Sequence, residues 1–181
     1  MSYYIAGFAG SLRKGSFNKN VLNFVAEREN DVYIHPFDEL PLFNADLESG
    51  GDPVQVKRWK DQIKQADGLF IVTPEYSHAM PGVAKNALDW AGSIANENVL
   101  DKKPVMIIGA SPTGMGTGFA QAQMRQVLAA CGAYVMPQPE VFIGRVHNIM
   151  DENGRLTDQG TVDFLADAIN EFRSFIAMCQ Q

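Results

Sequence analysis

The chain has 181 residues, of which 46% are apolar and 20% are charged, and its formal net charge at pH 7 is −6. A chain of this length and apolar content can bury a full hydrophobic core, which argues against a disordered protein. Its negative charge argues against nucleic acid or an anionic membrane surface as a partner.

Short apolar runs alternate with helical patterns along the chain. In chain order we expect strands at 3–9, 32–35, 68–73, 104–110 and within 134–142, helices at 18–29, 54–65, 82–96, 119–130 and 161–179, and an irregular segment at 36–53. Two of the strands are almost continuously apolar, which indicates burial on both faces. The pattern predicts an α/β fold, a three-layer sandwich with a five-stranded parallel sheet of order 2-1-3-4-5 and helices on both faces. We find no internal repeat or composition break, so residues 1–181 are expected to form one domain.

The cysteines and histidines give no metal pattern. Cys131 and Cys179 fit neither a CxxC nor a metal-ligand spacing, which favours reduced thiols in the cytoplasm. His35, His78 and His147 show no metal-ligand spacing either, so no metal is expected. The chain opens without a signal-peptide pattern and has no apolar run long enough for a membrane span, so an intracellular protein without a membrane partner is expected.

The segment 10–18 is a polar, glycine-containing loop between the first expected strand and the first expected helix. At such a junction, the free N–H groups of the first helical turn and the positive end of the helix dipole favour a phosphate. Ser11, Ser16 and Asn18 add neutral donors, and Arg13 adds a guanidinium that suits a terminal phosphate. The alternative is an ordinary helix cap with Arg13 in solvent.

Two more polar loops follow strands, at 74–82 and 111–118. In the order 2-1-3-4-5, the strands before all three loops are neighbours, so the loops are expected to meet at one edge of the sheet. Two prolines restrict the backbone of the loop 74–82, and three glycines in the loop 111–118 allow main-chain N–H groups to approach a planar ligand. A phosphate pocket beside a flat pocket indicates a mononucleotide, and FMN is the candidate.

The motifs GSLRKGSFN, PEYSHAMPGVAKNALDW and SPTGMGTG resemble those of the NADPH-dependent FMN reductase family, which includes flavodoxin-like quinone, azo and chromate reductases. This resemblance implies a flavodoxin-like fold, FMN as the cofactor and NADPH or NADH as the co-substrate. The FMN-binding residues that it implies are Ser11, Arg13, Ser16, Phe17 and Asn18 in the first loop, Pro74, Glu75, Tyr76 and Ser77 in the second, and Ser111 and Gly114 in the third. Ser77 stands where the family commonly has Asn.

The expected mechanism rests on the flavin, so no catalytic side chain is predicted. NAD(P)H would reduce the bound flavin and leave, and a small-molecule electron acceptor would then bind at the same face, which gives ping-pong kinetics. Quinones are the first expected acceptors, and azo compounds, nitroaromatics and metal oxyanions fit the same open face. His78 is interpreted as solvated rather than as a substrate contact.

Other functions stay open. The chain could be an FMN reductase that uses flavin as a substrate, a flavodoxin-type electron carrier, or a flavin-free protein of the same fold. In the expected helix 82–96, two adjacent apolar faces are wider than the stripe that packs on one sheet, which predicts a partner subunit. The resemblance agrees and implies a homodimer or homotetramer.

Overall fold

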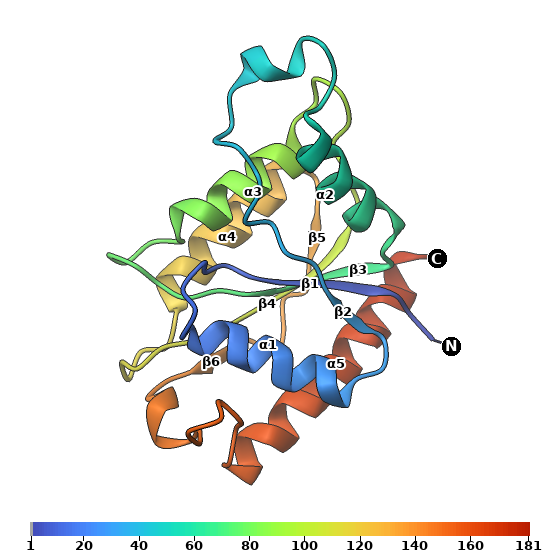
Figure 1. Cartoon of the computed structure of the whole chain (residues 1–181). Coiled ribbons are helices and arrows are strands. Elements are labelled where there is room, and N and C mark those ends of the chain that lie inside the picture. Colours follow the sequence, from blue (N-terminus) through green and yellow to red (C-terminus); the bar gives the residue numbers. More distant parts are fainter. Residues whose placement is uncertain (1) are drawn as a thin grey trace.

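A computed structural model describes residues 2–181. It contains one parallel sheet between two layers of helices (Figure 1). The strands are β1 (Ile5–Ala9), β2 (Val32–Ile34), β3 (Gly68–Val72), β4 (Pro104–Ala110), β5 (Tyr134–Val135) and β6 (Val141–Ile143). The helices are α1 (Phe17–Arg28), α2 (Val54–Gln65), α3 (Gly82–Gly92), α4 (Gly118–Ala130) and α5 (Gln159–Cys179), with short 3₁₀ helices at Ala45–Glu48 and Val146–Asn148.

The strand order is β2-β1-β3-β4-β5, and every pair in the sheet is parallel. The predicted fold class and strand order are therefore confirmed. A sixth strand was not expected: the single strand predicted within 134–142 is divided into β5 and β6, which both pair with β4. Pro137 and Pro139 lie between them and have no N–H group to donate, so the ladder cannot continue through this segment.

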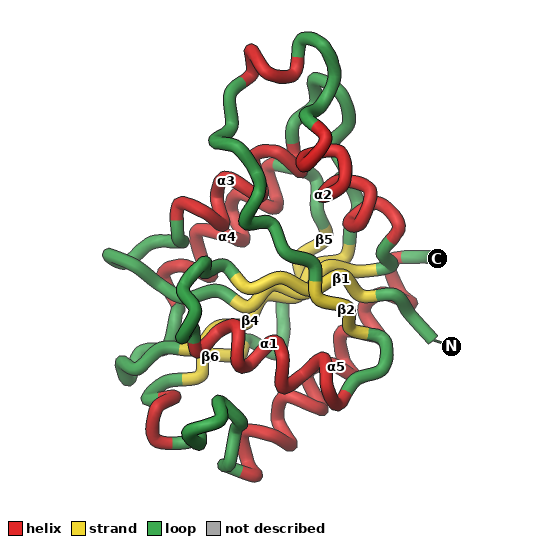
Figure 2. The backbone as a smooth tube through the Cα atoms, viewed as in Figure 1, coloured by secondary structure: helices red, strands yellow, loops and turns green. Residues whose placement is uncertain are grey.

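Side chains of the central strands alternate between two cores. Phe70 and Met106 belong to the core that includes residues of α1 and α5, and Ile71 and Ile107 belong to the core that includes residues of α2, α3 and α4. All four are at most 1% exposed. Figure 2 shows these helices on the two sides of the sheet. Burial of both sheet faces explains the continuous apolar runs of β3 and β4, because neither face of these strands meets water.

The helix α3 ends earlier than predicted, which narrows the apolar surface that the sequence assigned to it. It stops at Gly92, so Ile94 lies beyond its end and is 87% exposed. Most of the other apolar residues of the two faces are buried within the chain, namely Ala84, Ala87, Leu88, Trp90 and Ala91. Trp90 is fully buried, its indole Nε1 donates to the Pro41 carbonyl at 2.8 Å, and its ring packs on Phe43. The irregular segment 36–53 therefore covers the part of this surface that contains Trp90 and leaves Ile94 exposed.

A close approach near the end of β4 positions the loops that follow the central strands. A Cβ at Gly109 would lie 1.9 Å from Thr117 Oγ1 and 2.3 Å from the Thr73 carbonyl oxygen, so no larger residue fits. The absence of a side chain lets the end of β3 and the start of α4 pack on β4.

Candidate active site

Three loops meet at the carboxyl edge of the sheet. They follow β1, β3 and β4, which are neighbours, and the structure places the predicted site residues on them, except for Phe17 and Asn18, which form the start of α1 (Figure 1). The Ser11 hydroxyl lies 3.4 Å from the Tyr76 hydroxyl, which connects the first loop to the second. The Asn18 side chain contacts Ala110 at the end of β4, which connects the first loop to the third. The expected convergence of the loops is therefore observed.

The first loop presents main-chain donors at the start of α1. Ser16 caps the helix, and its hydroxyl accepts a hydrogen bond from the Lys19 N–H at 3.3 Å. The N–H groups of Phe17 and Asn18 donate to no other residue within 2–181. Arg13 is exposed and pairs with no acid in the described part of the chain. Free N–H groups, a helix N-terminus and a nearby guanidinium form a site with the donors that a phosphate dianion requires.

The side chain of Asn18 has a different role from the predicted one. It is 2% exposed, its Nδ2 donates to the Ala110 carbonyl at 2.9 Å, and its Oδ1 accepts from the Ala110 N–H at 2.8 Å. The amide therefore links the start of α1 to the end of β4.

The second loop contains a strained turn. Tyr76 and Ala79 exchange two main-chain hydrogen bonds of 3.1 and 3.0 Å, and between them Ser77 and His78 have φ values of 51° and 58°. Positive φ at both central residues defines a type I′ turn, which Asn and Gly adopt more readily than Ser or His. Non-glycine residues in the left-handed region cost roughly 1–2 kcal/mol each, and strain of this kind is concentrated at functional sites.

The carboxylate of Glu75 makes two contacts within the protein. Its Oε2 accepts a hydrogen bond from the Ala120 N–H at 3.0 Å, and its Oε1 lies 3.6 Å from Nδ1 of His78. The helix α4 has no side-chain cap of its own at Thr117, so Glu75 supplies the acceptor and the negative charge that a helix N-terminus favours. Any contact that Glu75 makes with a bound ring would come from its main chain.

The exposed residues at the tip of the second loop are Tyr76, Ser77 and His78. Tyr76 is 44% exposed, and the side chain of His78 is 76% exposed and packs edge-on against Phe119. Pro74 is buried beneath them. The turn therefore presents a phenol ring and an imidazole to the edge of the sheet.

The third loop offers main-chain donors as well. Ser111 is buried, its hydroxyl lies 2.9 Å from that of Thr113, and its N–H donates to the Ile143 carbonyl. The N–H groups of Gly114 and Met115 have no acceptor among residues 2–181. Donors at this position suit the carbonyl edge of a planar ring.

Arg145 was missed in the sequence analysis. It follows β6 with a φ of 49°, its N–H donates to the Thr113 carbonyl, and a Cβ at Gly114 would lie 3.7 Å from its Nε. Because we had expected one strand over 134–142, we did not count the loop after β6 among those at the carboxyl edge. The sequence feature that could have drawn attention to Arg145 is its place shortly after the apolar run 141–143.

An apolar groove of about 460 Å³ runs beside the first two loops. Leu12 and Tyr76 line it from the loops, Pro81 and Val83 from the start of α3, and Leu42 from the irregular segment. A groove of this size and character accommodates a planar aromatic molecule.

Residues 3–148 match the family model described as NADPH-dependent FMN reductase. The chain belongs to this family. It is 40% identical over 173 residues to a quinone reductase of Escherichia coli (strain K12), with 92% of each chain covered. It is 37% identical over 179 residues to a 2-hydroxy-1,4-benzoquinone reductase of a Burkholderia species, with 97% of each covered. Among solved structures, it is similar to the flavoenzyme FerB of Paracoccus denitrificans, an NAD(P)H:(acceptor) oxidoreductase, with a TM-score of 0.88, 33% identity, and 97% and 98% of the two chains covered.

Family membership makes the chain an NAD(P)H-dependent oxidoreductase that works with FMN. The geometry fits that flavin: free N–H donors at the start of α1 suit its phosphate, and free N–H donors after β4 suit its ring. Within residues 2–181, no group of three or more His, Cys, Asp or Glu side chains is arranged to hold a metal ion. No helix in the same range is long and apolar enough to cross a membrane.

Proposed function

We propose that the protein catalyses the two-electron reduction of quinones by NAD(P)H, with FMN as a bound cofactor and the whole chain acting as one FMN-binding domain. The observation that carries this proposal is the position of the apolar groove directly beside the loops with free main-chain donors. Tyr76 belongs to both the second loop and the groove. A molecule in the groove would therefore lie against a ring held by the three loops.

The residues of each loop have distinct proposed tasks. The N–H groups of Phe17 and Asn18, the hydroxyls of Ser11 and Ser16 and the guanidinium of Arg13 would hold the FMN phosphate. In the second loop, Tyr76 and the main chain around Pro74, Glu75 and Ser77 would contact the ring. In the third, the N–H of Gly114 would donate to the carbonyl edge of the ring, and the buried Ser111 would support the loop through Thr113.

The bound flavin supplies the redox chemistry by accepting two electrons from NAD(P)H and passing them to the acceptor. The protein orients both partners and excludes water from one face of the ring. Main-chain N–H groups after β4 would hold the carbonyl edge of the ring and would favour negative charge there.

A neutral aromatic acceptor fits the groove best. Its walls are mostly apolar, and Asp38 is the one ionisable acid among its lining residues. A quinone buries apolar surface there without leaving a charge unpaired. Two relatives with this chain's length are named as quinone reductases, which supports the same substrate class.

Steady-state kinetics with FMN-loaded protein test the proposal. We expect parallel double-reciprocal lines when NADH or NADPH and a benzoquinone are varied, because one donor must leave before the acceptor binds. Intersecting lines, or a rate with quinones below that with free FMN, would contradict it.

A second candidate is reduction of free flavin, since the family carries the name FMN reductase. The two functions differ in whether FMN stays on the protein. Gel filtration after loading separates them: the proposed function predicts that FMN elutes with the protein. Loss of FMN together with NAD(P)H-dependent turnover of added FMN would favour the second candidate.

We also propose a homodimer or homotetramer located in the cytoplasm. Leu42 and Ile94 are 83% and 87% exposed on the same side of the molecule as α3, and a second copy would cover them. Cys131 and Cys179 are both free thiols, as a reducing compartment requires. Light scattering at micromolar concentration tests the assembly, and a fully active monomer would contradict it.

A further inference from the structure

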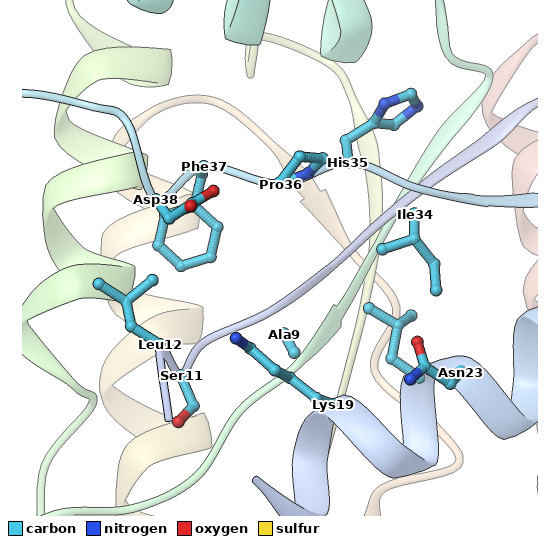
Figure 3. Close-up of a pocket in the computed structure, with 11 residues that line it drawn as sticks. Ala9, Ser11, Leu12, Lys19, Asn23, Ile34, His35, Pro36, Phe37 and Asp38 are labelled. Carbon is cyan, nitrogen blue, oxygen red and sulfur yellow. The ribbon is translucent and has the colours of Figure 1, made fainter. Parts of the chain in front are cut away.

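A separate cavity of about 320 Å³ opens next to the phosphate loop, between the carboxyl ends of β1 and β2 (Figure 3). Lys19 and Asn23 on α1 form one side, and residues 34–38, which continue from β2, form the other. Leu22 and Ile34 contribute apolar surface. None of the FMN contacts proposed above requires this space apart from Ser11, which lies at its border.

The cavity holds one cation and one acid among its lining residues, Lys19 and Asp38. The ammonium group of Lys19 forms no ion pair with any residue in the range 2–181. His35 adds no charge at neutral pH: its Nε2 lies 2.6 Å from the Tyr4 hydroxyl, and burial lowers the pKa of its imidazole. A ligand with both a phosphate and hydroxyl groups would satisfy the two charged side chains together.

This cavity adjoins the apolar groove. Leu12, Phe37 and Asp38 line both, so the two hollows lie side by side, the groove bordered by Tyr76 and the cavity by Lys19. The groove lies where an acceptor or nicotinamide would meet the flavin, and the cavity lies at the carboxyl edge of β2. In open α/β sheets the crevice at the carboxyl ends of the strands is the usual place for nucleotides, and an acidic residue near the end of a strand can bind ribose hydroxyls.

We propose that this cavity binds the adenosine diphosphate end of a dinucleotide. Leu22 and Ile34 would cover the adenine, Lys19 would pair with the pyrophosphate, and Asp38 would accept hydrogen bonds from the ribose. The inference rests on the proposed function. Two dinucleotides carry this group: NAD(P)H, with its nicotinamide in the groove, and FAD, with its flavin phosphate on the first loop.

Calorimetric titration of the FMN-loaded protein with ADP is the direct test, combined with inhibition of NADH oxidation by ADP. We expect Lys19→Gln to weaken ADP binding about tenfold or more, the value of a charge-assisted hydrogen bond. Asn23 is exposed on α1, so Asn23→Trp should fold, fill the cavity and abolish ADP binding. The matched controls are Lys57→Gln and Glu27→Trp, which alter exposed helical residues that do not line the cavity.

The outcome also identifies the dinucleotide. Competitive inhibition against NADH that is lost in Asn23→Trp supports the proposal with NAD(P)H as the ligand. ADP binding without competition, together with tighter binding of FAD than of FMN to the apoprotein, supports it with FAD as the ligand. The proposal is overturned if ADP does not bind, or if both cavity variants bind ADP with the affinity of the unaltered protein. It is also overturned if ADP binds but does not compete with NADH and the apoprotein binds FAD no more tightly than FMN. In these cases the unaltered protein would still retain FMN on gel filtration and reduce quinones with parallel double-reciprocal lines, whereas failure of the proposed function would show as loss of FMN or as a rate with free FMN above that with quinones.

Discussion

The first and second loops of the candidate site differ in what their side chains do. In the first loop, the Asn18 amide and the Ser16 hydroxyl oxygen are hydrogen-bonded within the protein, and the donors that remain for a ligand include main-chain N–H groups and the exposed guanidinium of Arg13. In the second loop, the Glu75 carboxylate is hydrogen-bonded to α4, and the groups that remain are the exposed ring of Tyr76 and a strained turn. We propose that the phosphate is recognised mainly by backbone geometry and the ring by shape. The first loop should therefore respond to substitutions that move its backbone, and the second to substitutions that change its surface or release strain.

Loss of the Asn18 amide should have the largest effect. Asn18→Leu leaves the buried N–H and carbonyl of Ala110 without partners, which we expect to cost about 2–4 kcal/mol in the free energy of unfolding. FMN affinity should fall as well, because the loop is no longer fastened to β4. Urea denaturation measures the first effect, and fluorescence titration with FMN measures the second.

The control for this prediction is Asn20→Leu, which makes the same substitution two residues further along α1. Asn20 is partly buried and makes one long contact of 3.6 Å to Met150 Sδ. Equal losses of stability in the two variants would show that the Asn18–Ala110 pair has no special role.

Removal of the guanidinium of Arg13 should lower the affinity for FMN without lowering the stability of the fold. Arg13→Ala should weaken FMN binding by about 1.5–3 kcal/mol, the value of a hydrogen bond to a charged group. The side chain is exposed, so the free energy of unfolding of the apoprotein should hardly change. Lys14→Ala makes the same change of charge at the neighbouring exposed position and should have a much smaller effect. Unchanged FMN affinity in Arg13→Ala would contradict phosphate binding by this side chain.

Substitution of Glu75 tests whether the second loop depends on α4. Glu75→Ala removes the acceptor for the Ala120 N–H and should lower the free energy of unfolding by about 1–2 kcal/mol, as for loss of a helix cap. Glu75→Gln keeps an acceptor oxygen and should recover part of this loss. If both variants are as stable as the parent but lose FMN, the carboxylate touches the flavin and our description of its role is wrong.

Relief of strain at Ser77 should give the smallest effect, with the opposite sign. Ser77→Asn should raise the free energy of unfolding by roughly 0.5–1 kcal/mol, because Asn tolerates the left-handed region better than Ser. Ser93→Asn is the matched control, since Ser93 has a φ of −65°. Thermal unfolding of both variants would show the difference, and an equal shift in the two would contradict the strain argument.

The sequence predicted much of the fold because the strands β3 and β4 are continuously apolar and the helices alternate with them. It also predicted that the three loops converge, since parallel strands carry their carboxyl ends to one edge. The end of α3 was wrong by four residues, because Ile94 and Ala95 continue an apolar pattern that the helix does not follow. The split between β5 and β6 was missed although two prolines marked it.

The roles of individual side chains were harder to predict. A polar residue in a loop can serve a ligand or the protein, and the sequence shows only that Asn18 and Glu75 are polar. Their partners, Ala110 and Ala120, contribute main-chain groups, which leave no pattern in the sequence. The position of Arg145 beside Gly114 could not be predicted for a related reason. It depends on a left-handed backbone conformation at Arg145, which a basic residue does not indicate.

The central claim is that main-chain N–H groups at the start of α1 hold the phosphate of FMN. Titration of the apoprotein with FMN and with riboflavin tests it directly, since the two ligands differ only in the phosphate. We expect FMN to bind at least about 100-fold more tightly, as two or more charge-assisted hydrogen bonds would provide, and we expect Arg13→Ala to reduce this ratio without changing riboflavin affinity. Equal affinities for FMN and riboflavin would contradict the account.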